Sequence, residues 1–303
     1  MTTTAPTPES IRAEFDARGF VLSEDAAVAL FLAETLGKPL LLEGPPGVGK
    51  TEIAKLWAEI HAAPLIRLQC YEGLDEAKAL YEWSYGKQML YATLLREKVG
   101  ALLAGARDLA EAMEVLRGQA DLFFSCDFLL PRPLLAAITS PDRPVLLVDE
   151  VDRADAEFEA FLLEVLSENQ VTVPELGTLR AAVPPRAILT SNATRDLSDA
   201  LRRRCLFLYL DYPSVEEEER ILRKRVPGAG EDFVRRIVKM VASLRRSELE
   251  KPPGIAEVVD WTRALVAVSA DSLDRETLRK TLGALLKNKE DLDRVLADPS
   301  KFR

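Results

Sequence analysis

The stretch Leu41-Leu-Glu-Gly-Pro-Pro-Gly-Val-Gly-Lys-Thr51 decides how this chain folds. It contains the complete pattern G-x-x-x-x-G-K-T, from Gly44 to Thr51. The apolar run before it, Pro39-Leu-Leu-Leu42, predicts a buried strand, and residues 51–60 after it place apolar side chains on one face of a helix. Strand, glycine loop and helix in this order are the context in which the pattern binds phosphate. A glycine turn that binds nothing is the weaker interpretation.

Each residue type in this loop has a chemical reason to be there. The glycines let backbone N–H groups converge on phosphate oxygens, and the following helix points its partially positive N-terminus at the same anion. Lys50 is expected to reach the β- and γ-phosphates, and the Thr51 hydroxyl to bind Mg²⁺. The predicted nucleotide-binding residues are therefore Gly44, Pro45, Pro46, Gly47, Val48, Gly49, Lys50 and Thr51.

A second apolar run ends in two acidic residues. Pro144-Val-Leu-Leu-Val-Asp149-Glu150 predicts a buried strand with carboxylates at its carboxyl end, where ligands bind in open α/β sheets. Asp149 is expected to hold Mg²⁺ through its water shell, and Glu150 to orient and polarise an attacking water. The alternative is an ordinary strand end with solubilising acids, which the upstream phosphate loop disfavours.

Two later segments carry polar residues suited to the same chemistry. Asn192 ends the next predicted strand, and its amide can hydrogen-bond a γ-phosphate and a water together, although a turn-forming asparagine is the alternative. Leu201-Arg-Arg-Arg204 precedes the predicted strand at residues 206–210. A guanidinium can neutralise charge that develops on a γ-phosphoryl group. A solvated basic surface is the alternative, and it fits one of the three arginines better than all of them.

Composition favours a globular protein that works inside the cell. The chain has 303 residues with 48% hydrophobic and 29% charged residues. No apolar run approaches the length of a membrane span and no signal pattern precedes the first helix, so a cytoplasmic location is expected. Cys70, Cys126 and Cys205 are odd in number and widely spaced, and are expected to be free thiols. With one histidine, His61, they form no recognisable zinc cluster.

The order of elements predicts an α/β fold with two domains. Strands near residues 39–42, 64–70, 144–150, 186–192 and 206–210 alternate with helices, which predicts a mostly parallel five-stranded sheet between helices. A hairpin is expected over residues 170–182. A helix is expected over about 24–36, with Ser23 as its N-cap and Gly37 at its end. After Pro213 the pattern is wholly helical, so we predict a core domain at 1–212 and an all-α domain at 213–303. A helical insertion is expected at about 84–130, with helices at 88–98 and 104–117.

With these parts in order, the chain resembles the AAA+ ATPases and, within them, the MoxR group, over residues 20–270. The loop resembles Walker A, Val145–Glu150 resembles Walker B and Asn192 resembles sensor 1. In the arginine-rich segment Arg204 matches the arginine finger best, and Arg203 is next.

Three further stretches carry the finer resemblance. Asp149-Glu-Val-Asp-Arg-Ala154 resembles the D-E-x-N-R-A signature of MoxR proteins, with Asp152 in place of the usual Asn. Tyr81-Glu-Trp-Ser-Tyr-Gly-Lys-Gln88 and Asp199-Ala-Leu-Arg-Arg-Arg-Cys-Leu-Phe-Leu-Tyr-Leu-Asp-Tyr-Pro213 resemble the CoxD-like branch. Members of that branch accompany carbon monoxide dehydrogenase and related molybdenum hydroxylases.

The resemblance implies a function, cofactors and partners. It implies Mg²⁺-dependent ATP hydrolysis in a homo-oligomeric, usually hexameric, ring, by an αβα core with a helical lid. Lys50, Glu150, Asn192 and an arginine from the neighbouring subunit, Arg204 or Arg203, would be catalytic, and Thr51 and Asp149 would hold the metal. It further implies a chaperone that works with a von Willebrand factor A domain partner to mature a metalloenzyme, here a molybdenum hydroxylase of the carbon monoxide dehydrogenase type.

One departure from the family pattern keeps an alternative open. MoxR proteins usually carry a Pro-Arg sensor 2 at the start of a lid helix, whereas Lys251-Pro-Pro-Gly-Ile-Ala-Glu257 has Gly254 where the arginine would fall. Arg263 lies more than two helical turns downstream. The lid would then couple to nucleotide through backbone or Glu257, or weakly. The alternative is a nucleotide-gated binding module that barely turns over, which the complete Walker B motif argues against.

A nucleic-acid motor is a third possibility, and the charge disfavours it. The net charge is −9, and no tract interleaves basic and aromatic residues. The sequence leaves open the client, the partner, the ring size, whether force is applied to a substrate, and which of Arg202, Arg203 and Arg204 acts in trans.

Overall fold

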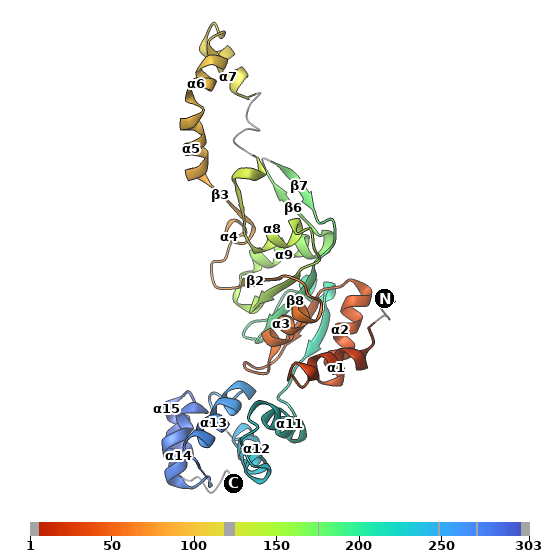
Figure 1. The fold of residues 1–303 in the computed structure, drawn as a ribbon, viewed down its shortest axis with the longest axis vertical. Coiled ribbons are helices and arrows are strands. Elements are labelled where there is room, and N and C mark those ends of the chain that lie inside the picture. Colours follow the sequence, from red (N-terminus) through yellow and green to blue (C-terminus); the bar gives the residue numbers. More distant parts are fainter. Residues whose placement is uncertain (1–5, 118–124, 175, 248, 271, 298–303) are drawn as a thin grey trace. The chain divides into compact units, whose positions relative to one another are not determined.

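The computed structural model describes residues 6–117, 125–174, 176–247, 249–270 and 272–297. Five strands form the main sheet: β1 (Leu40–Glu43), β2 (Leu65–Gln69), β5 (Val145–Asp149), β8 (Arg186–Ser191) and β9 (Leu206–Tyr209). Their order is β2-β5-β8-β1-β9, and β1 pairs in parallel with β8 and β9, as β2 does with β5. Figure 1 labels β2 and β8 of this sheet. The predicted α/β class with a five-stranded parallel sheet is confirmed.

The chain divides into two compact units. One contains Met1–Ala62, Ile188–Asp196 and Cys205–Arg303, and the other contains Ala63–Ala187 and Leu197–Arg204. The boundary expected between residues 212 and 213 is a different division of the chain, and it stays a prediction.

In the first unit, helices α1 (Pro8–Ala17), α2 (Glu24–Leu36) and α3 (Lys50–Ile60) accompany β1, β8 and β9. Helix α2 begins as its sequence predicts, because the Ser23 side chain accepts a hydrogen bond from the Ala26 N–H. It ends at Gly37, whose φ of 61° closes the helix in the left-handed conformation. All four residues of β1 are buried, which makes this strand the centre of the unit.

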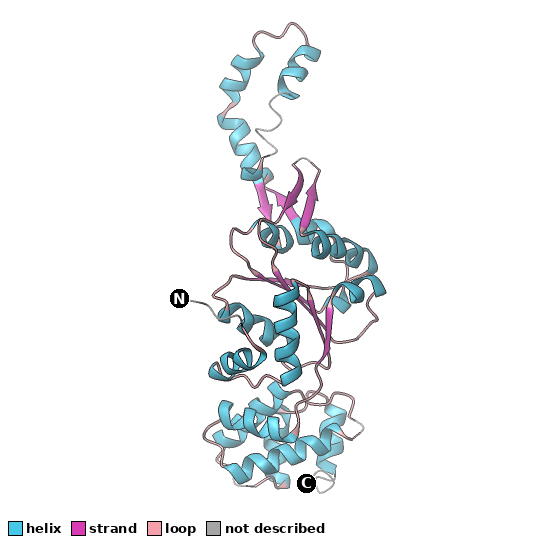
Figure 2. Cartoon of the chain, turned by 90° about the vertical axis from the view of Figure 1, so that its right-hand side faces the viewer, coloured by secondary structure: helices cyan, strands magenta, loops and turns pink. Residues whose placement is uncertain are grey.

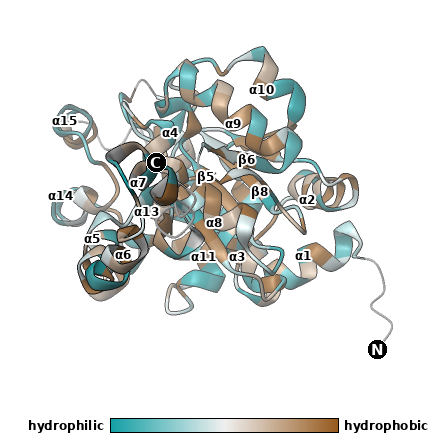
Figure 3. Cartoon of the chain, turned by 90° about the horizontal axis from the view of Figure 1, so that it is seen from above, coloured by the Kyte–Doolittle hydropathy of each residue, from teal (hydrophilic) through white to brown (hydrophobic). Residues whose placement is uncertain are grey.

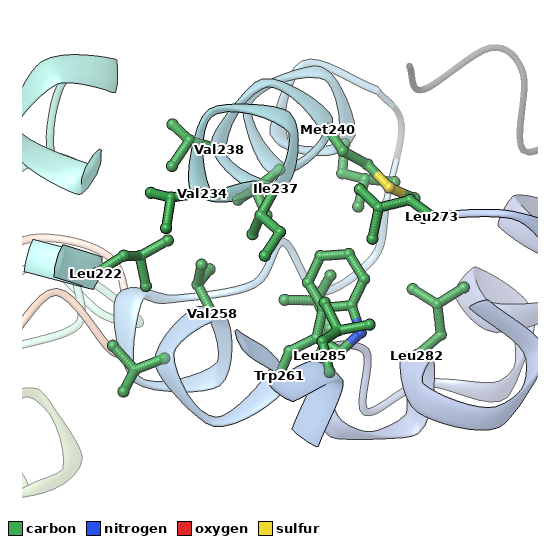
Figure 4. Packing of buried hydrophobic residues seen from close by; sticks show 14 of the residues in the cluster. Leu222, Val234, Ile237, Val238, Met240, Val258, Trp261, Leu273, Leu282 and Leu285 are labelled. Atoms are coloured by element: carbon green, nitrogen blue, oxygen red, sulfur yellow. The ribbon is translucent and has the colours of Figure 1, made fainter. Parts of the chain in front are cut away.

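The same unit contains a group of helices after Ser214, and every element described in this part of the chain is helical (Figure 2). They enclose a hydrophobic core of their own, in which Leu222, Ile237, Trp261 and Leu285 are at most 1% exposed (Figure 4). The elements are α11 (Val215–Arg225), α12 (Glu231–Arg245), α13 (Ile255–Ala267), α14 (Arg275–Thr281), η4 (Leu282–Ala284) and α15 (Lys289–Ala297).

The second unit contains β2 and β5 with most of the short elements. Its helices are α4 (Glu76–Leu80), α5 (Tyr85–Leu94), α6 (Arg96–Leu103), α7 (Leu109–Arg117), η2 (Cys126–Phe128), α8 (Pro133–Thr139), η3 (Val151–Arg153), α9 (Ala156–Glu168) and α10 (Asp199–Arg204). Strands β6 (Gln170–Val173) and β7 (Gly177–Arg180) form the predicted hairpin. Strands β3 (Tyr81–Trp83) and β4 (Leu129–Pro131) form a second antiparallel pair, which the sequence analysis missed, as it missed the largely apolar helix α8 (Figure 3).

The insertion differs in detail from its prediction. The helix expected at residues 88–98 is interrupted at Leu95, where φ of −89° and ψ of 0° end α5 before α6 begins. The helix expected at 104–117 begins only at Leu109. No glycine or proline marks the break at Leu95. The later start of α7 does have a sequence signal, because Gly105 lies between α6 and α7 and the Asp108 carboxylate accepts from the Glu111 N–H at 2.9 Å. Residues 118–124 of the predicted insertion lie outside the described residues.

Candidate functional site

The phosphate-binding loop, Gly44–Thr51, follows β1 and is tied to the strands on both sides of it. The Gly44 N–H donates to the Ser191 carbonyl at 3.2 Å, and the Leu210 N–H donates to the Glu43 carbonyl at 2.7 Å. A Cβ on Gly44 would lie 2.0 Å from the Leu210 carbonyl oxygen, a distance that no side chain can tolerate. The loop therefore requires glycine at this position because of tertiary packing as well as local conformation.

Helix α3 begins directly after the loop. Its N-cap residue is Gly49, with φ of 101°, which has no side chain that could cap the helix. The ammonium of Lys50 lies back on the loop and donates to the carbonyls of Gly44 at 2.6 Å and Pro45 at 2.8 Å. Although charged, Lys50 is only 7% exposed. A helix N-terminus that begins at a glycine and a buried ammonium beside it fit a phosphate group.

Asn192 lies beside this loop in the first unit. It directly follows β8, whose last residue, Ser191, is in register with Glu43 at the end of β1. Ser191 is fully buried, and its hydroxyl accepts from the Ala193 N–H at 3.0 Å and donates to the Glu43 carboxylate at 3.4 Å. The structure thus brings the predicted sensor 1 residue and the phosphate-binding loop together, at the carboxyl ends of paired strands.

The two acidic residues at the end of β5, Asp149 and Glu150, belong to the second unit, and neighbouring side chains hold both. Asp149 is 3% exposed, and one of its oxygens accepts from Arg67 Nη2 at 2.6 Å and Nε at 3.0 Å. Glu150 Oε2 accepts from Gln69 Nε2 at 3.1 Å and forms an ion pair with Arg153 at 3.0 Å. Arg67 and Gln69 are two residues apart on β2, which pairs with β5. Residues two apart on a strand point to the same face, and this spacing is the signal that could have identified Arg67 and Gln69 in the sequence.

The backbone of Glu150 has an unusual conformation for a residue with a side chain. Its φ of 55° and ψ of 50° lie in the left-handed region, which costs about 1–2 kcal/mol for a non-glycine residue. The Arg153 N–H donates a hydrogen bond to the Glu150 carbonyl at 2.9 Å, and this bond closes the turn that follows Glu150. Such strained positions occur preferentially at functional sites, so this conformation supports a role for Glu150 beyond packing.

Cys70 directly follows β2, and its thiol is buried close to negatively charged side chains. Its N–H donates to the Asp149 carbonyl at 2.8 Å. Burial, together with the charges of Asp149, Asp152 and Glu150, raises the pKa of the Cys70 thiol to about 12. Cys70 and Cys205 are free thiols as predicted, whereas the side chain of Cys126 lies outside what the structure describes.

The arginine-rich segment forms helix α10 in the second unit. The chain before it is fixed by Glu159, a 1% exposed residue of α9, whose carboxylate accepts from the Ser198 N–H at 2.9 Å. The Arg204 guanidinium donates to the Ser167 hydroxyl. Arg203 is exposed and has no hydrogen bond or ion pair within the described part of the chain. Arg203 is therefore the freer of the two arginines matched to the arginine finger.

The lid segment matched to sensor 2 carries no arginine at the loop. Gly254 is the N-cap residue of α13, and its backbone contacts the phosphate-binding loop at Gly47. Arg263 lies further along α13, where it is 56% exposed and pairs with Asp260 at 3.5 Å.

Among the residues that the structure describes, no helix is both long and apolar enough to cross a membrane.

Comparison with known proteins identifies the family. An uncharacterized protein of Staphylococcus aureus strain USA300 is 24% identical over 246 residues, which cover 79% of this chain and 79% of that protein. The gas vesicle ATPase GvpN of Haloferax mediterranei is 26% identical over 252 residues, which cover 80% of this chain and 66% of GvpN.

A solved structure of Thermotoga maritima RuvB, a Holliday junction branch migration motor, matches 98% of this chain and 80% of its own, with 18% identity and a TM-score of 0.45. The sequence model of the AAA domain (dynein-related subfamily) matches residues 39–205, more than half of the chain. This match includes the phosphate-binding loop, the two acids at the end of β5, Asn192 and the arginines of α10. The chain therefore belongs to the AAA domain family, in its dynein-related subfamily.

Proposed function

We propose that this protein is an Mg²⁺-dependent ATPase of the AAA+ type. The observation that supports the proposal most strongly is the loop Gly44–Thr51, with the N-terminus of α3 directly after it and the buried Lys50 ammonium beside it. Lys50 would exchange its carbonyl acceptors for the β- and γ-phosphates, where a charge-assisted hydrogen bond is stronger. Loop residues Gly44, Pro45, Pro46, Gly47, Val48, Gly49 and Thr51 would surround the phosphates.

Thr51 and Asp149 would hold the metal ion. One hydroxyl and one carboxylate, together with phosphate oxygens and water, are the donors that Mg²⁺ takes in nucleotide sites. When bound, Mg²⁺ supplies neutralisation of the charge that develops on the phosphates. Asp149 accepts hydrogen bonds from Arg67 in the structure, so the Arg67–Asp149 ion pair would have to open or share its oxygen on metal binding.

Glu150 would act as general base and Asn192 would position the reacting groups. A Glu150 carboxylate oxygen would take the proton of the attacking water, and the Asn192 amide would hydrogen-bond the water and the γ-phosphate. Gln69 and Arg153 hold the Glu150 carboxylate in the structure, so turnover would require it to leave Gln69.

An arginine of α10 would complete the site of a neighbouring subunit in a homo-oligomeric, hexameric ring. A guanidinium supplied in trans accelerates phosphoryl transfer by about 10³–10⁵ in known cases. The absence of any partner for exposed Arg203 within the described part of the chain supports Arg203, and the sequence match supports Arg204. An isolated subunit would then turn over slowly.

Within the superfamily we propose a MoxR-type chaperone located in the cytoplasm. The stretch Asp149–Ala154 and the similarity to GvpN over 252 residues support this assignment. The client would be a metalloenzyme, specifically a molybdenum hydroxylase of the carbon monoxide dehydrogenase type, and a protein with a von Willebrand factor A domain would be the partner. Co-purification of such a hydroxylase in a form lacking its mature metal centre would support the client; maturation that proceeds normally without this protein would contradict it.

Steady-state ATP turnover measured against protein concentration tests the ATPase proposal. Wild type, Glu150→Gln, Arg203→Ala and Arg204→Ala are compared. Turnover per subunit should rise with concentration, Glu150→Gln should bind ATP without hydrolysing it, and one arginine variant should lose turnover at all concentrations. A rate per subunit that stays constant across the range where the oligomer dissociates would contradict the trans-acting arginine.

A nucleotide-gated switch with little turnover is the second candidate. It is favoured by the glycine at position 254 and by the restraint of Glu150 by Gln69 and Arg153. Wild type that binds ATP tightly and neither hydrolyses it nor assembles at high concentration would support this candidate over the first.

A further inference from the structure

The chain just before α13 approaches the phosphate-binding loop at backbone distance. The Ile255 N–H donates to the Gly47 carbonyl at 3.1 Å. A Cβ on Gly254 would lie 2.8 Å from the Gly47 Cα and 3.0 Å from the Pro46 carbonyl oxygen, both within the range that real Cβ atoms avoid or barely reach. No side chain fits at Gly254, so at this residue the segment contacts the loop through its backbone. One side chain from the first turn of α13 also lies at this contact.

That side chain is Glu257. Its Oε2 would lie 3.2 Å from a Cβ on Gly47 and 2.9 Å from a Cβ on Gly254, which places the carboxylate against the same contact. This oxygen is buried, and it has no hydrogen-bond partner in the described part of the chain. A buried carboxylate oxygen without a partner is uncommon in folded proteins and needs an explanation.

The position of this segment is fixed by a buried ion pair. Arg245, near the end of α12, donates from Nε to the Pro253 carbonyl at 2.9 Å. Its other nitrogens pair with Glu218 of α11 at 2.8 and 3.0 Å, and its guanidinium lies 4.4 Å from the centre of the Tyr212 ring. Glu218 is 1% exposed. Arg245 is thus a positioning residue that holds the chain before α13, and with it Glu257, at the loop.

Tyr212 reports on the charge of its surroundings. Burial raises the pKa of Tyr212, Arg245 lowers it, and the negative charges of Asp211 and Glu257 raise it further. The charge of Glu257 therefore raises the pKa of a side chain in the segment between β9 and α11.

We infer that Glu257, three residues after Gly254, senses the phosphates of a nucleotide at the loop through charge repulsion. The inference rests on the proposed function, because it requires ATP to bind at this loop. A glycine loop that collects N–H donors attracts anions, and a carboxylate at its edge opposes a second negative charge. Binding of ATP would then be linked to movement of Glu257 and α13 away from Gly47. By linkage, the free energy that this repulsion takes from ATP binding shifts the equilibrium toward the conformation in which α13 has moved away from Gly47.

Equilibrium binding of a fluorescent ATP analogue to the full chain tests this inference, with ATP and ADP as competitors. Glu257→Gln removes the charge and keeps the shape of the side chain. Asp260→Asn is the matched control, because Asp260 is on the same helix, carries the same charge and is 68% exposed. We expect Glu257→Gln to bind ATP about tenfold tighter than wild type, with a smaller gain for ADP, and Asp260→Asn to be unchanged.

Hydrogen exchange provides a second measurement. ATP should increase exchange at the Ile255 amide in wild type, because the bond to the Gly47 carbonyl opens. An affinity of Glu257→Gln for ATP that is equal to or weaker than that of wild type would overturn the inference. Wild type that fails to bind ATP at all would instead overturn the proposed function together with this inference.

Discussion

The phosphate-binding loop and the acidic end of β5 are constrained by different kinds of interaction. The loop depends on its backbone: Gly44 lies against the Leu210 carbonyl, and Gly49 begins α3. The acids depend on side chains: Arg67 and Gln69 on the neighbouring strand hold Asp149 and Glu150. A motif made from backbone geometry must keep its residue types, because only glycine has the required conformations. A carboxylate held by neighbours can have several partners, so its restraints do not form a recognisable motif.

The largest effect is expected from Gly44→Ala, which tests the dependence of the loop on its backbone. The added Cβ would meet the Leu210 carbonyl oxygen, so β1 and β9 must separate or the loop must rearrange. We expect a loss of at least about 2 kcal/mol in the free energy of unfolding and loss of nucleotide binding. Urea unfolding and nucleotide titration measure both.

Gly37→Ala is the control for this substitution. Gly37 has a positive φ of 61°, but nothing lies within 4 Å of its added Cβ. Its cost should be about 1 kcal/mol, with nucleotide binding retained. Equal behaviour of the two variants would show that the φ angle alone, and not the contact with Leu210, constrains Gly44.

The next effect tests the side-chain restraint on Asp149. Arg67→Met removes the guanidinium and should lower the Mg²⁺ concentration needed for half-maximal nucleotide binding by roughly threefold to tenfold. The free energy of unfolding should fall by only about 1 kcal/mol or less, because Arg67 is 48% exposed. Arg132→Met is a matched control, since Arg132 is 50% exposed and pairs with Glu82 at 2.5 Å. An unchanged Mg²⁺ requirement in Arg67→Met would contradict competition between Arg67 and the metal.

A smaller effect is expected at Glu150. Gln69→Leu removes one hydrogen bond to the Glu150 carboxylate and leaves the ion pair with Arg153. It also removes the hydrogen bond that Gln69 Oε1 accepts from Arg67 Nη2. Freed from Gln69, the carboxylate should reach water more often, so turnover should rise about threefold while the affinity for ATP stays constant. Turnover assays and nucleotide titration of the same preparation separate the two quantities. A fall in turnover would indicate that Gln69 holds Glu150 in its productive position.

The smallest perturbation probes the charge around the acids through Cys70. A pKa of about 12 means that the folded protein keeps this thiol protonated well above the usual value, so the reactive thiolate is scarce at pH 8. Mass spectrometry after iodoacetamide treatment at pH 8 should find Cys70 unmodified in the native protein and modified in urea. Because the thiol of the unfolded chain ionises at lower pH, stability should also fall as the pH rises above about 9. Rapid native labelling would contradict a buried, negatively surrounded thiol.

Much of the architecture followed from local patterns. Apolar runs predicted all five strands of the main sheet, and Ser23 and Gly37 predicted both ends of α2. These signals are local, because a strand core needs consecutive apolar residues and a helix end needs a particular cap. Pairing of β3 with β4 was not predictable in the same way, because Trp83 and Leu129 are far apart in the sequence and the pairing depends on the intervening chain.

The sequence by itself determined the phosphate-binding loop, because its glycines and Lys50 act through a conformation that only those residue types allow. It also determined the positions of Asp149, Glu150 and Asn192 at strand ends, because hydrophobic runs mark where strands stop. Only the tertiary structure decided what holds these groups. Arg67 binds Asp149 and Glu257 lies against Gly47, and both contacts join residues that are far apart in the sequence. The left-handed backbone conformation of Glu150 is likewise visible only in the structure. Such contacts depend on how elements pack, and packing is a property of the whole fold that no local pattern encodes.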